Sequence, residues 1–179
     1  MQTRKEYIIQ FVGLSIGIHE FKFEAKDSFF KDFEFSEIKK GNVLVNLHLL
    51  KQSQMMVLEF EIGGTVKMEC DLCTGEFDLP LNGTHRLIVK VGGGDTGNED
   101  DDIITIAANE HELDLAQYIY EYITLTLPIK RVHPLDKKGN STCDKEVLEK
   151  LEKFRIEEEK QEEEKTDPRW NDLKNIKLN

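Results

Sequence analysis

Apolar and polar residues alternate with a period of two along much of the first hundred positions, as expected for β-strands with one buried face. The alternation is visible at 7–11 and 21–25, and it is clearest at 43–49 and 56–62. In the last two stretches every second residue is apolar, and several of the residues between them are polar or charged. The pattern therefore predicts several strands that share one hydrophobic face.

Glycine and proline place the expected breaks between these strands. Gly41-Asn42 predicts a turn, and Gly63-Gly64 predicts a turn or a bulge before the residues that lead into two cysteines. Further strands are expected at 77–81, 87–91 and 103–106. Pro80 lacks a backbone donor, so we expect its strand to lie at a sheet edge at that point.

Three stretches change from the strand period to a helical one. Asp27 can cap a short helical turn rich in phenylalanine, since its carboxylate can accept free amides at a helix start. Residues 113–127 carry apolar side chains at helical spacing, which predicts an amphipathic helix of about four turns. Asp114 would lie in its first turn, and Pro128 would end it. Asp144 can open a third helix, most of which is charged.

These elements predict an α+β fold. We expect a predominantly antiparallel β-sheet or an open barrel, with one packed amphipathic helix and a charged C-terminal helix. The expected organisation is a β-rich domain over 1–143, a charged helix over 144–165 and a tail over 166–179. Trp170 in that tail is a candidate anchor for a partner or for the protein's own surface.

The charge of the chain narrows its possible partners. It has 35 acidic and 24 basic residues, a formal net charge of −11. Such a chain repels polyanions at long range, so a basic partner suits it better than bare nucleic acid. The sequence has no signal segment and no apolar run near the roughly 20 residues that span a bilayer. We therefore expect a soluble protein in the cytoplasm, with a solvated acidic loop at 92–102.

The most specific chemical feature is the pair Cys70 and Cys73. Two thiolates in C-x-x-C spacing can hold one metal ion from a tight turn, and Gly75 is expected to supply a positive φ there. They make half of a tetrahedral zinc site. His133 and Cys143 can supply the other half, so the candidate site is Cys70, Cys73, His133 and Cys143, with Zn²⁺ as the candidate cofactor.

Two other interpretations of the cysteine pair remain open. A redox pair of the thioredoxin type should open a helix, whereas the residues after Cys73 have a turn and strand pattern. Alternatively, the cysteines are reduced and simply pack a β-turn. His85 and His111 lie beside predicted element starts and suit a ligand role less well. The sequence lacks the common catalytic motifs, including G-x-S-x-G, G-x-x-x-x-G-K and H-E-x-x-H, so we do not expect an enzyme.

The order of these features resembles the YceD family over roughly 43–177. That family has a C-x-R-C-x-x-x-F knuckle, a glycine- or acid-rich gap, an I-D-L start, a helix with E-x-I-x-L-x-L-P, and a histidine or cysteine cluster. The closing segment DPRWNDLKNIK at 167–177 is also similar. Leu72 stands where the family commonly has arginine. The matching positions are Cys70, Cys73, Phe77, Leu113-Asp114-Leu115, Glu121, Ile123, Leu125, Leu127, Pro128, His133 and Cys143.

The resemblance implies a bacterial cytoplasmic protein needed for accumulation of 23S ribosomal RNA, with no established catalytic activity. We expect a factor in assembly or maturation of the large subunit that binds a ribosomal protein or a pre-50S particle. One alternative is direct contact with ribosomal RNA through a basic loop, since a few basic residues can contact phosphates even in an acidic chain. The candidate residues are Lys130, Arg131, Lys137 and Lys138. Another is a thiol redox protein that uses Cys70 and Cys73.

Overall fold

The computed structural model describes residues 3–92 and 102–164. The chain divides into two compact units, which we call the sheet unit and the cysteine unit. The sheet unit comprises Met1–Glu69 and Glu76–Arg131, and the cysteine unit comprises Cys70–Gly75 and Val132–Asn179. Within the described ranges, no helix combines the length and the apolar composition that a membrane span requires.

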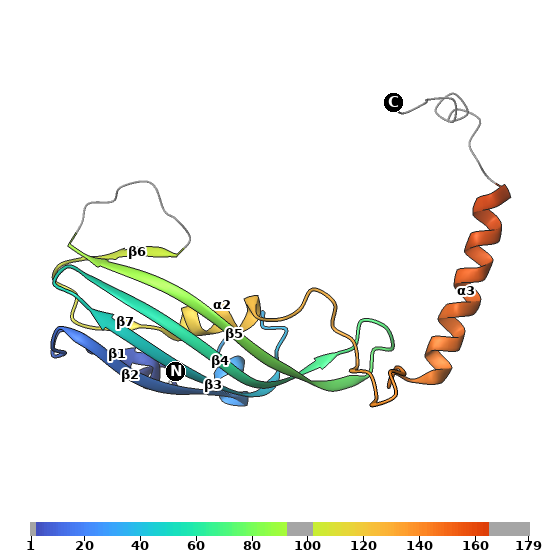
Figure 1. Ribbon diagram of the computed structural model, residues 1–179, viewed down its shortest axis with the longest axis horizontal. Helices are drawn as coiled ribbons and strands as arrows, with labels where there is room; N and C mark the ends of the chain where they lie inside the picture. The colour runs from blue at the N-terminus through green and yellow to red at the C-terminus, as the bar shows by residue number, and fades with distance from the viewer. Residues whose placement is uncertain (1–2, 93–101, 165–179) are drawn as a thin grey trace, which may run out of the picture. The chain divides into compact units, whose positions relative to one another are not determined.

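A five-stranded sheet forms the frame of the sheet unit (Figure 1). Its strands are β2 (Gly17–Lys26), β3 (Lys40–Lys51), β4 (Met55–Glu69), β5 (Glu76–Val91) and β6 (Ile103–Ile106). They lie in this order, and every neighbouring pair is antiparallel except β5 with β6. The sheet is open, with β2 and β6 at its two edges, so the predicted α+β fold is confirmed as a sheet and not as a barrel.

One face of this sheet is buried, as the period-two pattern predicts. Leu47 of β3 pairs with Phe60 of β4, Phe60 pairs with His85 of β5, and both Leu47 and Phe60 are fully buried. The helix α2 (Ala116–Leu125) covers this face, where its Tyr122 ring lies 5.1 Å from that of Phe60 (Figure 1). The remaining elements of the unit are η1 (Thr3–Tyr7), β1 (Ile8–Ile9), α1 (Asp27–Lys31) and β7 (Leu113–Asp114), the last of which pairs with β1.

The dipeptides Gly41-Asn42 and Gly63-Gly64 both lie inside strands, so the predicted breaks there are wrong. Gly41-Asn42 belongs to β3, and Gly63-Gly64 belongs to β4 with an unbroken pairing register. Gly64 has a φ of +154°, and a Cβ atom there would lie 2.3 Å from the carbonyl oxygen of Asn42. Glycine is needed because two paired backbones approach closely, and not because the chain turns.

The two strands predicted on either side of residue 82 form one strand. β5 runs without interruption from Glu76 to Val91, and it pairs with β4 from Glu76 to Lys90. Pro80 pairs with Thr65 on that side, whereas β6 pairs with β5 only from Ile88 onward. The missing donor of Pro80 therefore lies on a side of β5 that has no partner strand in the described chain, which confirms the edge prediction.

The predicted helices exist, but Asp114 and Asp27 do not take the positions at the helix starts that the sequence predicts. α2 begins at Ala116, later than predicted, because Leu113–Asp114 pairs with β1 as a strand. The Asp114 carboxylate accepts the Ala116 amide at 2.9 Å and so caps the helix from outside its first turn. At α1, Asp27 does not cap the helix. Its carboxylate instead accepts the backbone amide of Gly41 at 2.9 Å.

Candidate metal centre

The candidate metal centre consists of Cys70, Cys73, His133 and Cys143. Its first half, with Cys70 and Cys73, is a closed turn that follows β4 and precedes β5 in the sequence. The amide of Thr74 donates to the carbonyl of Cys70 at 2.9 Å, and the amide of Cys70 donates to the carbonyl of Gly75 at 3.0 Å. Thr74 has a φ of 57°, in the left-handed region, so the prediction that Gly75 supplies the positive φ is wrong. A Cβ atom on Gly75 would instead lie 3.4 Å from the His133 ring.

The second half of the centre is a loop that folds back on itself. The Asp136 carboxylate accepts the amides of Lys138 and Asn140, each at 2.8 Å. This is a turn held by an aspartate side chain, and Gly139 within it has a φ of 83°. A β-bridge between Leu135 and Ser141 closes the loop. Because the chain returns in this way, ligands ten residues apart can meet at the base of the loop.

Four ligand atoms converge where these two halves meet. The Sγ atoms of Cys70, Cys73 and Cys143 and a ring nitrogen of His133 all lie within 4.8 Å of one another. Cys70 Sγ lies 3.6 Å from Cys143 Sγ, and His133 Nδ1 lies 3.4 Å from Cys73 Sγ and 3.6 Å from Cys143 Sγ. Zinc–sulfur bonds of about 2.3 Å in a tetrahedron place neighbouring ligand atoms about 3.7 Å apart. The separations therefore match a four-coordinate metal site.

The surroundings favour a negative charge at one sulfur. Burial raises the pKa of the Cys70 thiol, but hydrogen bonds from the amides of Cys73, Leu72 and His133, together with the His133 side chain, lower it to about 6. For Cys143, a hydrogen bond from Ser141 lowers the pKa, but burial and the sulfurs of Cys70 and Cys73 outweigh it and raise the pKa. The raised pKa of Cys143 reflects the cost of a second negative charge beside Cys70, and a bound cation would offset that cost.

Comparison with protein-family models gives a match over residues 58–177 to the large ribosomal RNA subunit accumulation protein YceD. The chain belongs to the YceD family. Comparisons with curated proteins and with solved structures found no match. The family match includes all four converging residues of the centre, and it connects this protein with the accumulation of large-subunit ribosomal RNA.

The basic residues considered for RNA contact in this YceD protein are divided between the two units. Lys130 and Arg131 belong to the sheet unit, where the Arg131 guanidinium donates to the Glu37 carboxylate at 2.6 Å. Lys137 and Lys138 are exposed in the Asp136 turn of the cysteine unit. Trp170 lies outside the described residues.

The two histidines that suited a ligand role less well both lie in the sheet unit. The ring of His85 stacks on that of Tyr122 at 4.7 Å, and its Nε2 is 3.0 Å from the hydroxyl of Thr126. Burial lowers the pKa of His85. This histidine packs between the sheet and α2, and His111 is exposed.

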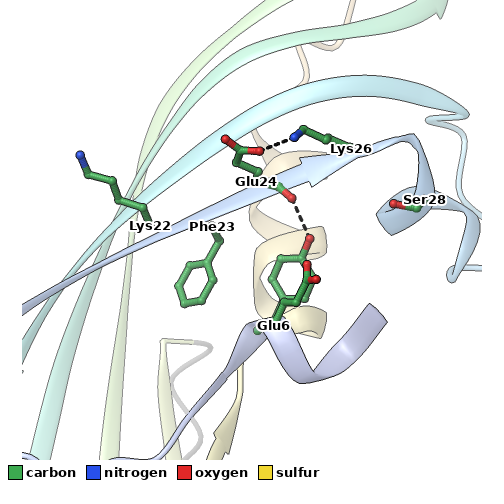
Figure 2. Close-up of a pocket in the computed structure, with 7 residues that line it drawn as sticks. Glu6, Lys22, Phe23, Glu24, Lys26 and Ser28 are labelled. Carbon is green, nitrogen blue, oxygen red and sulfur yellow. Dashed lines mark hydrogen bonds and ion pairs between the residues drawn. The ribbon is translucent and has the colours of Figure 1, made fainter. Parts of the chain in front are cut away.

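A hollow of about 270 Å³ in the sheet unit is lined by residues of η1 and β2 and by Ser28 (Figure 2). The Tyr7 hydroxyl in this hollow donates to the carbonyl of Glu24 at 2.8 Å. Burial raises the pKa of Tyr7 to about 12. Lys26 forms an ion pair with the Glu24 carboxylate. The hydrogen bond of Tyr7 attaches η1 to strand β2, and the ion pair lies within β2, so we interpret the hollow as structural.

Two residues that shape the centre were not predicted from the sequence. Thr74 takes the strained conformation in the knuckle, and Asp136 holds the turn that returns Cys143 to His133. The Asp-Lys-Lys-Gly-Asn composition at 136–140 is a recognisable turn signal and could have identified the second. Nothing in the sequence around Thr74 distinguishes it from the neighbouring glycine as the left-handed residue.

Proposed function

We propose that this YceD protein is a non-catalytic factor for accumulation of 23S ribosomal RNA that binds a ribosomal protein or a pre-50S particle in the cytoplasm. The family match over 58–177 carries this proposal. The net charge of −11 supports a basic protein as the first contact, because long-range attraction favours partners of opposite charge. The family description names accumulation of an RNA and no chemical reaction.

Purification of the tagged full chain from cells at low salt tests the partner. We expect large-subunit ribosomal proteins or precursor particles in the eluate, in amounts that fall as salt rises. A tagged variant in which exposed glutamates of β2 and β4, such as Glu20, Glu59 and Glu61, are changed to glutamine should recover less. Recovery of neither ribosomal proteins nor precursor particles from parent protein at low salt would contradict the proposal.

We further propose that the centre binds one Zn²⁺ ion with a structural role. Three sulfurs and one imidazole nitrogen form a ligand set that zinc favours, and four protein ligands leave no position open for a substrate. The three cysteines are buried, which also suits a closed structural site. The redox alternative is less well supported, since Cys73 is followed by a turn and by β5, and none of the described helices begins at the pair.

Native mass spectrometry of the full chain tests the zinc proposal. We expect one zinc per chain in the parent protein, and loss of zinc in the double variant Cys70→Ser, Cys73→Ser. His111→Asn is a matched control for His133→Asn, because both remove an imidazole and only His133 lies in the centre. A metal-free parent mass for protein purified without chelator would contradict the proposal. Normal 23S accumulation by the double variant would show that neither metal nor redox chemistry is essential.

A second candidate function is direct contact with ribosomal RNA through Lys137 and Lys138. The specific observation is that the Asp136 turn presents both lysines, exposed, from an ordered loop. Lys137→Ala with Lys138→Ala should then weaken RNA binding and reduce the salt dependence by about one counterion per lysine. Lys145→Ala with Lys150→Ala is the control, since it removes two exposed lysines elsewhere in the same unit. Equal affinity of both variants for ribosomal RNA would remove this candidate.

A further inference from the structure

The cysteine unit lacks a hydrophobic core among its described side chains, which extend over 70–75 and 132–154. Its three buried residues are Cys70, Cys73 and Cys143, and each has a relative exposure of 6% or less. Several of its large apolar side chains lie at the surface, and Val147 and Leu148 are half-buried. Leu135, Leu151 and Phe154 are 65%, 45% and 64% exposed. Apolar burial therefore contributes little to the stability of this unit.

The backbone hydrogen bonds of the cysteine unit are mostly local. The knuckle closes on itself through the amides of Cys70 and Thr74, and the loop closes on itself at Asp136. The two segments are separated by more than fifty residues of sequence, and they meet at the ligand atoms described above. Short turns of this kind seldom hold together without a metal or a disulfide.

The start of a long helix is attached directly to one ligand. Cys143 is followed by Asp144, whose carboxylate accepts the amide of Glu146 at 2.9 Å and whose carbonyl accepts the amide of Leu148 at 3.1 Å. These contacts begin α3 (Lys145–Glu164). Starting a helix is the costly step of its formation, so a fixed first turn matters most where packing is sparse. The described side chains of α3, at 145–154, are exposed or half-buried.

We propose that metal binding folds the cysteine unit, so that the knuckle, the Asp136 loop and the first turns of α3 are ordered when the ion is bound and disordered when it is removed. This inference rests on the proposed metal site. The sheet unit has its own hydrophobic core and keeps its fold in both states. Metal supply then controls whether the protein presents the Lys137–Lys138 turn and the helix to a partner. The centre is in this respect a conformational switch.

Hydrogen–deuterium exchange of the full reduced chain, with zinc and after removal of zinc by a strong chelator, tests the proposal. Mass spectrometry of the same samples establishes whether the ion is present. We expect amides at 135–154 to exchange at least about tenfold faster without zinc, and amides of β3 and β4 to keep their protection. Added zinc should restore the protection, and added magnesium should not, because Mg²⁺ prefers oxygen ligands.

Two variants make the result independent of the chelator. His133→Asn should exchange as the chelated parent does, even in excess zinc, whereas His111→Asn should behave as the zinc-bound parent. If zinc binds and its removal leaves exchange at 135–154 unchanged, metal-coupled folding is wrong while the zinc site stands. If the parent never binds zinc, the site proposal itself fails and takes this inference with it. Faster exchange of β3 and β4 together with 135–154 would also overturn the inference, since the units would then unfold as one.

Discussion

The two units of this protein are stabilised by different physical means. In the sheet unit, side chains such as Leu58 and Phe60 are fully removed from water, and paired strands satisfy the backbone over long stretches. In the cysteine unit, the buried side chains are three thiols, and the apolar residues Leu151 and Phe154 remain exposed. The hydrophobic effect can therefore hold the first unit, whereas it contributes little to the described part of the second.

Because of this difference, we expect substitutions in one unit to change the stability of that unit and not of the other. A cavity or a backbone clash in the sheet should unfold the sheet unit and leave the chemistry of the cysteines unchanged. A change in the knuckle should alter metal binding and leave the sheet intact.

Phe60→Ala should cause the largest loss of stability. Phe60 is fully buried in β4 and its ring packs near that of Tyr122, so its truncation leaves a cavity and should lower the free energy of unfolding by about 3–5 kcal/mol. Urea denaturation followed by circular dichroism measures this loss. Glu61→Ala, on the opposite face of the same strand, should change stability by less than about 0.5 kcal/mol. Similar losses for the two variants would show that this face of the sheet is not the core.

Gly64→Ala should have the next largest effect. The new Cβ atom would lie 2.3 Å from the Asn42 carbonyl oxygen, and the φ of +154° is unfavourable for alanine, so we expect a loss of about 2–3 kcal/mol. Gly63→Ala is a close control, because nothing lies within 4 Å of a Cβ atom there. Thermal unfolding of the pair measures the difference. Equal melting temperatures would refute the close approach of β3 and β4 at this point.

Thr74→Gly should strengthen the cysteine unit by a smaller amount. Glycine tolerates the φ of 57° that costs a threonine about 1 kcal/mol, so zinc affinity should rise by roughly fivefold. Competition with a chromophoric chelator measures the affinity, and urea denaturation should show no change in the sheet unit. Both variants lose the hydrogen bond from the hydroxyl to the Cys73 carbonyl, but Thr74→Ala keeps the strain, so it should not gain affinity. A gain in Thr74→Ala equal to that in Thr74→Gly would rule out backbone strain as the cause.

The smallest predicted effect is a pH dependence of the sheet unit. Burial lowers the pKa of His85 in the folded protein below its ordinary value of 6.5, so the unfolded chain binds more protons in the interval between the two values. The contribution of His85 is therefore fully present above pH 6.5 and is lost as the pH falls through the folded pKa. Melting temperatures measured from pH 7.5 down to 5 should fall less steeply in His85→Gln than in the parent. His111→Gln should keep the parental slope, and a flattened slope there would assign the effect to general charge.

The sheet was largely predictable because strand alternation is a local property of sequence. Leu58 and Phe60 face the core, and Glu59 and Glu61 face away, as the period of two requires. Chain continuity was less predictable. Glycine permits turns, bulges and close backbone contacts alike, so Gly64 alone could not show that β4 continues past it.

The candidate centre was predictable in composition and unpredictable in geometry. The spacing of Cys70 and Cys73 indicated half of a metal site, since a tight turn alone can bring two such thiols to one ion. Completion by His133 and Cys143 depended on a chain reversal at Asp136 and on a meeting between segments far apart in sequence. Thr74 was missed because the conformation it adopts is imposed by the closed turn and not by its own preference.

By itself, then, the sequence determined which side chains form the core of the sheet, where the cysteine turn lies, and the family to which the chain belongs, because each of these is written in local order and spacing. Only the tertiary structure decided that Gly41-Asn42 and Gly63-Gly64 lie inside continuous strands, and that the basic residues at 130–131 and 137–138 fall in separate units. It also decided that the three cysteines and His133 converge while the rest of their unit buries no apolar side chain among those described. These outcomes depend on contacts between distant segments, for which local sequence carries no signal.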